Sequence, residues 1–200
     1  MNHYIDEFLS LRCAGDVLNV VNPLGNKSQK EITESMAVIK RIKHIVLKDE
    51  PMTYSVVDLC AGNALTSVLA AFLFPIKQAI AVDKKPRNRK WNTADRFDYR
   101  LRDILNDPIT GIDKNTIIIS IHPCGKLAEK VCEIYNKSEA SHLILMPCCK
   151  GQFKSNQWLK ERLGNYGEWC LHLSNLVDGQ LVQDMNVISP KNIVITAKKG

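Results

Sequence analysis

Short runs of β-branched, aliphatic and aromatic residues alternate along the chain with segments that have the length and composition of helices. Five of these runs predict strands, at 55–59, 79–82, 99–102, 116–121 and 142–146. A sixth run, 193–197, follows the turn 189–192 and predicts a terminal strand. Strands that alternate with helices are typical of a parallel sheet covered on both faces. We therefore predict a doubly wound α/β fold with a mostly parallel sheet.

Two helices are predicted around the first strand. Residues 64–74 are almost entirely apolar and end before Pro75, which cannot continue a helix. Residues 30–48 carry apolar side chains at spacings of three and four, which predicts an amphipathic helix packed on the sheet; they are Ile32, Met36, Ile39, Ile42 and Val46. Its opposite face should be solvated, with contact to phosphates as the alternative; the basic residues there are Lys40, Arg41, Lys43 and Lys48.

The composition is that of an ordinary globular protein. The chain has 200 residues, of which 45% are hydrophobic and 24% charged, and it contains no repeat or linker that would divide it. We predict one domain, 1–200, with a helical cap over 1–50 and an α/β core over 51–200. The net charge of +6 permits a polyanionic partner without requiring one. No apolar run approaches the roughly 18 residues of a membrane span, and a signal peptide is not evident, so we expect a cytoplasmic protein without membrane contact.

The turn between the first strand and its helix, 58–65, lies where nucleotides bind in such folds. Small residues let the backbone approach a ligand, and they recur at alternate positions, Cys60, Gly62 and Ala64. Asp83 ends the second strand, 21 positions after Gly62, where a carboxylate would accept hydrogen bonds from ribose hydroxyls. A dinucleotide fingerprint would require glycine at Leu65, which disfavours a nicotinamide cofactor.

This loop resembles motif I of the Rossmann-like, S-adenosylmethionine (SAM)-dependent methyltransferases. The resemblance implies a seven-stranded sheet, SAM as the cofactor and methyl transfer as the reaction. In that family a residue after the third strand contacts adenine, and the matching residue is Asp103, whose alternative role is to cap the segment that follows. The cofactor-binding residues that we infer are Asp58, Cys60, Ala61, Gly62, Asn63, Ala64, Asp83, Lys84, Asp103 and His122.

Histidine and cysteine residues follow the fourth and fifth strands. The fourth is followed by His122-Pro123-Cys124-Gly125, and the fifth by Pro147-Cys148-Cys149. These motifs resemble a branch of the methyltransferases that includes enzymes acting on the ribose 2′-hydroxyl of a tRNA acceptor-stem nucleotide. The resemblance covers about 56–151, with a further match at 189–192, but the zinc modules of those enzymes are missing. Nor does the chain carry the Lys-Asp-Lys-Glu pattern of other ribose methyltransferases.

A sugar hydroxyl becomes a good nucleophile only when its proton leaves, and an imidazole is suited to take that proton. We therefore predict His122 as the catalytic residue, assisted by Cys124 and Cys148; the alternative is a histidine packed on Pro123. Histidine and cysteine also bind zinc. We expect no metal, because the adjacent Cys148 and Cys149 at a strand end should point in opposite directions.

Five basic residues follow Asp83 directly, at positions 84, 85, 87, 89 and 90. They could hold RNA phosphates, and the adjacent Trp91 could stack on a base; the alternative is a solvated helix start with a half-buried tryptophan. We predict a SAM-dependent methyltransferase that acts on RNA, with the ribose 2′-hydroxyl of tRNA favoured. The alternatives are methylation of a small molecule or protein side chain, and a non-catalytic module that binds SAM or RNA.

Overall fold

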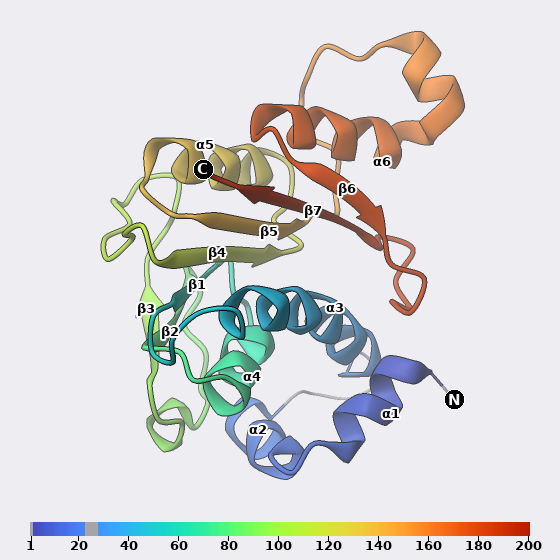
Figure 1. Ribbon diagram of the computed structural model, residues 1–200. Helices are drawn as coiled ribbons and strands as arrows, with labels where there is room; N and C mark the ends of the chain where they lie inside the picture. Colours follow the sequence, from blue (N-terminus) through green and yellow to red (C-terminus); the bar gives the residue numbers. More distant parts are fainter. Residues whose placement is uncertain (1, 23–27) are drawn as a thin grey trace.

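One seven-stranded sheet forms the centre of the computed structural model, which describes residues 2–22 and 28–200 (Figure 1). The strands are β1 Ser55–Leu59, β2 Gln78–Asp83, β3 Phe97–Leu101, β4 Thr116–Ile121, β5 His142–Met146, β6 Gln180–Gln183 and β7 Ile193–Lys198. Their order across the sheet is β3-β2-β1-β4-β5-β7-β6. The first five strands pair in parallel, whereas β7 is antiparallel to both β5 and β6. The predicted α/β fold with a mostly parallel sheet is confirmed.

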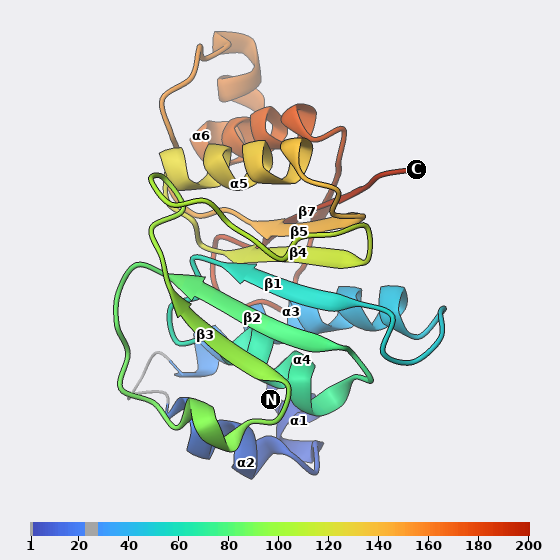
Figure 2. The same ribbon diagram turned by 90° about the vertical axis from the view of Figure 1, so that its left-hand side faces the viewer.

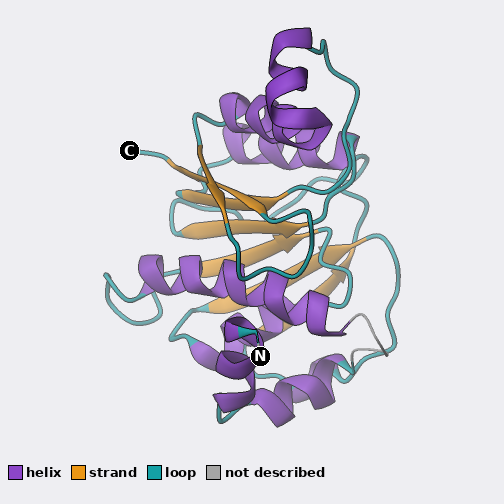
Figure 3. Cartoon of the chain, turned by 90° about the vertical axis from the view of Figure 1, so that its right-hand side faces the viewer, coloured by secondary structure: helices purple, strands orange, loops and turns teal. Residues whose placement is uncertain are grey.

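Helices cover both faces of the sheet (Figures 1 and 2). Their bounds are α1 His3–Ser10, α2 Ala14–Val21, α3 Ser28–Val46, α4 Leu65–Leu73, α5 Lys126–Lys137 and α6 Gln157–Leu176. Helices α1 to α4 lie on one face, and α5 and α6 lie on the other (Figure 3). Within the described ranges, no helix is long and apolar enough to cross a lipid bilayer.

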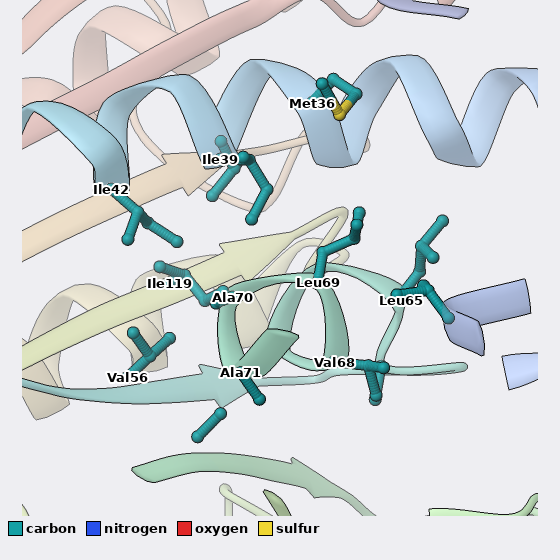
Figure 4. Close-up of a cluster of buried hydrophobic side chains, with 14 of the residues drawn as sticks. Met36, Ile39, Ile42, Val56, Leu65, Val68, Leu69, Ala70, Ala71 and Ile119 are labelled. Carbon is teal, nitrogen blue, oxygen red and sulfur yellow. The ribbon is translucent and has the colours of Figure 1, made fainter. Parts of the chain in front are cut away.

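Side chains that alternate along the central strands belong to two buried clusters, one on each face of the sheet. Val56 of β1 points into the cluster under α3 and α4, and its neighbour Val57 points into the cluster under α5 and α6. Figure 4 shows Ile39 of α3 and Leu69 of α4 meeting over the sheet near Ile119. Because both faces are covered, most residues of the central strands are apolar, which is why their sequence pattern is so clear.

Several elements differ from the predictions at their ends or in kind. Strand β3 spans Phe97–Leu101 rather than 99–102, and β6 was not predicted at all. We expected helices in all the segments between the strands. Residues 84–96 contain only a short 3-10 helix, η2 Trp91–Thr93, and residues 102–115 contain turns and no helix. The predicted helical cap over 1–50 corresponds to α1, α2 and α3, with residues 1 and 23–27 outside the described part.

The prediction that Arg41 belongs to a solvated face is wrong. Its guanidinium donates to the Asp184 carboxylate at 3.2 Å and to the Ala37 carbonyl at 2.6 Å. The Tyr4 hydroxyl donates to the same carboxylate at 2.8 Å. The β6–β7 hairpin therefore covers this side of α3, which is why apolar spacing alone failed to place Arg41. The other three basic residues of this face are exposed.

Candidate active site

The loop between β1 and α4 changes backbone handedness at alternate residues. Cys60, Gly62 and Ala64 have φ angles of 61°, 56° and 58°. A Cβ atom built on Gly62 meets no atom within 4 Å, so the conformation of the backbone, and not lack of space, favours glycine there. Successive residues of alternating handedness gather backbone N–H groups into a concave, anion-binding surface. The small residues found in the sequence thus form a tight turn at the carboxyl end of β1.

Asp83 is held against this loop by two backbone amides. Its Oδ2 accepts a hydrogen bond from the Gly62 amide at 2.9 Å, and its Oδ1 accepts one from the Lys85 amide at 2.8 Å. The Ala61 amide also donates to the Val82 carbonyl at 3.0 Å, which ties the loop to β2. A carboxylate oxygen can accept more than one hydrogen bond, so Asp83 keeps the capacity to accept from a pair of hydroxyl groups.

A cavity of about 240 Å³ opens beside Asp83. Apolar side chains of Val82, Ile104 and Leu127 supply part of its wall, and Lys84 and Asp103 also line it. Asp103 accepts hydrogen bonds from the amide of residue 105 at 3.1 Å and from the side chain of residue 106 at 3.2 Å. Asp103 therefore lies at the cavity, as predicted for an adenine contact. It also caps a turn, whereas the alternative from the sequence was a helix cap.

A second cavity, of about 250 Å³, lies on the other side of the loop and shares Cys60, Arg87 and His122 with the first. The predicted residues that line it are Asp58, Ala61, Gly62 and Asn63. Helix α3 adds Glu31 and Glu34, which the sequence analysis missed. Ala64 lines neither cavity, because it is fully buried at the start of α4.

Burial dominates the electrostatics of the loop. Asp58 is only 3% exposed and accepts a hydrogen bond from the Ser67 hydroxyl at 2.9 Å. Burial, together with the nearby charge of Asp83, raises the pKa of Asp58 to about 7. Burial likewise raises the pKa of the Cys60 thiol to about 12, so this thiol stays neutral.

His122 lies where the two cavities meet and contacts a carboxylate. Its Nε2 is 2.5 Å from Oε1 of Glu34, whose side chain is only 5% exposed. Its Nδ1 is buried and has no hydrogen-bond partner in the described part of the chain. The backbone of His122 is left-handed, with φ of 58°, and its amide donates to the Met146 carbonyl of β5 at 2.7 Å. The structure therefore pairs the predicted histidine with an acid from α3.

The predicted cysteines gather beside this histidine. The sulfur atoms of Cys124 and Cys148 are 3.1 Å apart, and those of Cys148 and Cys149 are 3.5 Å apart. The expectation that the adjacent cysteines point in opposite directions is wrong, because β5 ends at Met146 and both residues lie in the following loop. Cys124 lines the first cavity, whereas Cys148 does not; the Cys148 thiol contacts the sulfur of Cys124 and donates to the His122 carbonyl at 3.4 Å.

The basic run 84–90 is an irregular loop, not the start of a helix, and most of it is exposed. Arg87 lines both cavities, and the Arg89 guanidinium donates to the Asn63 side chain at 3.0 Å. Trp91 is half-buried, with its ring stacked on Tyr99 at 4.9 Å between centroids. One face of the indole is therefore already covered, as in the alternative considered above.

Comparisons with known proteins identify the class to which this fold and site belong. A family model described as a methyltransferase domain matches residues 27–156, more than half of the chain. The chain therefore belongs to the methyltransferase domain family, and it is a SAM-dependent methyltransferase. No curated protein matches it in sequence.

Solved structures share the fold at low sequence identity. The CurJ carbon methyltransferase is 13% identical, with a TM-score of 0.58 over 92% of this chain and 58% of that chain. The 23S rRNA methyltransferase ErmE is 13% identical, with a TM-score of 0.52 over 82% and 68%. A TehB-like SAM-dependent methyltransferase from Corynebacterium glutamicum is 10% identical, with a TM-score of 0.50 over 82% and 98%. These likenesses show the fold alone.

The residues around the two cavities suit the cofactor of this family. Asp83 can accept hydrogen bonds from the ribose hydroxyls, and the apolar wall of the first cavity suits the adenine ring. Glu31 and Glu34 of α3 line the second cavity beside Lys30 and Arg87, and their carboxylates can accept hydrogen bonds from an ammonium group. When bound, SAM supplies a methyl group carried on a positive sulfur atom, and the chain has to orient the acceptor and exclude water.

Proposed function

We propose that this methyltransferase modifies RNA at a ribose 2′-hydroxyl, with tRNA as the favoured substrate. The observation that carries the proposal is the contact between His122 and Glu34 at the junction of the two cavities. A neutral nitrogen or a thiolate attacks a methyl group without further help, whereas a sugar hydroxyl has to lose its proton. A half-buried imidazole paired with a buried carboxylate is suited to take that proton.

In the proposed reaction, the ribose oxygen attacks the methyl carbon while His122 takes the hydroxyl proton on Nδ1, since its Nε2 lies against Glu34. The carbon–sulfur bond breaks, and its electrons stay on the sulfur of the leaving cofactor. Glu34 is a positioning residue: it orients the ring and stabilises the positive imidazolium that forms. Cys124 lines the first cavity, and we propose that it contacts the acceptor, with Cys148 assisting as a positioning residue through its sulfur contact with Cys124.

The charge around the cavities supports a nucleic-acid substrate. Lys84, Lys85 and Arg87 all line the first cavity and are exposed, so they can also contact phosphates of a strand entering the site. The preference for tRNA rests on the resemblance of the His122–Gly125 and Cys148-Cys149 motifs to those of tRNA ribose methyltransferases.

We also propose that the helices before β1 and the α/β core function as one domain. Helix α3 supplies Glu31 and Glu34 to the second cavity, while the core supplies His122 and the loop after β1. A site assembled from both parts needs both parts to fold together.

The proposal is tested by transfer of a labelled methyl group from SAM to separated fractions of total RNA, protein and metabolites. The expected result is label in RNA, recovered after hydrolysis as a 2′-O-methylated nucleoside. Label confined to protein or to metabolites would contradict the proposal. So would RNA label recovered on a base.

Variants of the pair test the assigned roles. We expect His122→Gln to lower kcat by about 100-fold or more, because proton transfer is lost, and to weaken SAM binding far less than that. Glu34→Gln should lower kcat and change the pH dependence of the rate. Glu34→Asp should have part of the wild-type kcat and a pH dependence closer to that of the wild type. A pH profile that is the same in the wild type and in Glu34→Gln would reduce Glu34 to a packing role.

The basic loop is tested by a double variant, Lys85→Ala with Arg87→Ala. Loss of two phosphate contacts should raise KM for RNA about tenfold. The slope of log affinity for RNA against log salt concentration should become less negative by about 1.5. The matched control removes two exposed charges of α3, with Lys40→Ala and Lys43→Ala, and should change neither quantity. An unchanged KM for RNA in the loop variant would contradict phosphate binding there.

A further inference from the structure

Three thiols from two loops meet at the carboxyl ends of β4 and β5. The sulfur atoms of Cys124, Cys148 and Cys149 all lie within 4.8 Å of one another. Cys124 and Cys149 are exposed and Cys148 is half-buried, so a small ion can reach all three from solvent. Among the described residues this group contains no histidine, because the Nε2 of His122 lies against Glu34.

Backbone contacts hold the two loops together independently of the thiols. The Gly125 amide donates to the Cys149 carbonyl at 3.3 Å, next to the bond between the His122 amide and the Met146 carbonyl. Gly125 has φ of 52°, and a Cβ atom there would lie 3.7 Å from the Cα of Gly151. The left-handed backbone favours glycine at position 125, and the two hydrogen bonds between the loops fix the positions of the sulfur-bearing residues.

The separations suit a metal ion of the size of zinc. Two thiolates bound tetrahedrally to zinc, each at about 2.3 Å, lie about 3.8 Å apart. The observed separations of 3.1 Å and 3.5 Å require the sulfurs to move by less than about 1 Å to reach that arrangement. A bound cation would supply the positive charge that three thiolates need.

We propose that Cys124, Cys148 and Cys149 form a binding site for a thiophilic metal ion, Zn²⁺. Each thiol loses its proton as its sulfur bonds to the metal, so binding of one ion releases three protons to solvent. Three protein ligands leave one position of a tetrahedral ion for water or for an atom of the acceptor. The site does not depend on which substrate is methylated, and it replaces the expectation from the sequence that no metal binds.

Metal content and cobalt substitution test the site in the full-length, unmutated protein. Protein purified under reducing conditions without chelator should carry one equivalent of zinc. Co²⁺ should replace it and give the sulfur-to-metal charge-transfer absorption and the visible bands of a tetrahedral thiolate site. Absence of both, in protein whose thiols titrate as reduced, would overturn the proposal.

Single substitutions assign the ligands. Cys124→Ser, Cys148→Ser and Cys149→Ser should each weaken zinc binding by more than about 100-fold, because loss of an outer-shell partner alone costs about 10- to 100-fold. Cys13→Ser is the matched control, since this half-buried thiol lies at the start of α2 and should not affect binding. Equal zinc affinity in wild type and Cys148→Ser would overturn the proposal. A Cys124–Cys148 disulfide found by peptide mapping in protein kept with zinc under reducing conditions would also overturn it.

Discussion

The buried carboxyl of Asp58 makes the stability of the protein depend on pH in a way that one substitution can isolate. Asp58→Asn keeps the size of the side chain and an oxygen that accepts from the Ser67 hydroxyl, but it removes the ionisable group. Burial raises the pKa of Asp58 from 3.8 to about 7. The folded protein therefore binds this proton more tightly than the unfolded chain does.

The sign and size of the effect follow from this difference in pKa. Because the folded pKa is the higher one, the contribution to stability is fully present below about pH 4 and is lost as the pH rises to about 7. At about 1.4 kcal/mol per pKa unit, the full loss is about 4 kcal/mol. About 2 to 3 kcal/mol of that loss falls between pH 5 and pH 8. Relative to wild type, Asp58→Asn should therefore gain this amount over the same interval.

Urea unfolding, followed by circular dichroism at several pH values, measures the prediction. The quantity to plot is the difference in the free energy of unfolding between Asp58→Asn and wild type, since other titrating groups cancel in it. Asp95→Asn is the matched control, because Asp95 is exposed and its substitution should give a difference that is flat with pH. A difference that is also flat with pH for Asp58→Asn would refute the claim that burial raises the pKa of the Asp58 carboxyl.

Two further predictions test the cofactor loop and the packing behind the thiols. Asp83→Ala should weaken SAM binding about 100-fold in calorimetric titration, because it removes the ribose acceptor and leaves the Gly62 amide without its partner; binding unchanged within about threefold would remove Asp83 from the site. Gly151→Ala should destabilise the protein by about 1 to 3 kcal/mol in thermal unfolding, because the added Cβ would lie 2.5 Å from the Trp169 ring. Gly15→Ala, in α2 where a Cβ meets no atom within 4 Å, should instead stabilise it by about 0.5 to 1 kcal/mol, and equal effects at the two glycines would contradict the packing described.

The elements that the sequence predicted well are those whose neighbours bury them completely. Strand β4, Thr116–Ile121, has one intermediate residue at its end and is otherwise buried, and all of its residues except Ser120 are β-branched. All four residues of β6, Gln180–Gln183, are exposed, and only pairing with β7 makes them a strand. A sequence pattern reports burial, and it therefore carries little signal for an exposed edge strand.

The same limit applies to the site. The interval of 21 residues between Gly62 and Asp83 is set by one strand–helix–strand unit, so the sequence could predict that contact. Glu34 reaches His122 across 88 positions, and its place depends on how α3 packs. One signal was available: Glu34 lies between Ile32 and Met36 in the predicted helix, and a carboxylate that is buried there has to meet a partner.

The bonds that join Tyr4 to Asp184 and Asn2 to residue 186 have a consequence for how the protein folds. They link groups 180 and 184 positions apart, so α1 leaves the ribosome long before its hydrogen-bond partners are synthesised. Until the β6–β7 hairpin arrives, the Tyr4 hydroxyl and the Arg41 guanidinium lack the carboxylate that they share. Helix α3, which carries Glu34, thus reaches its final surroundings only in the last stage of synthesis, and the active site matures after most of the sheet has formed.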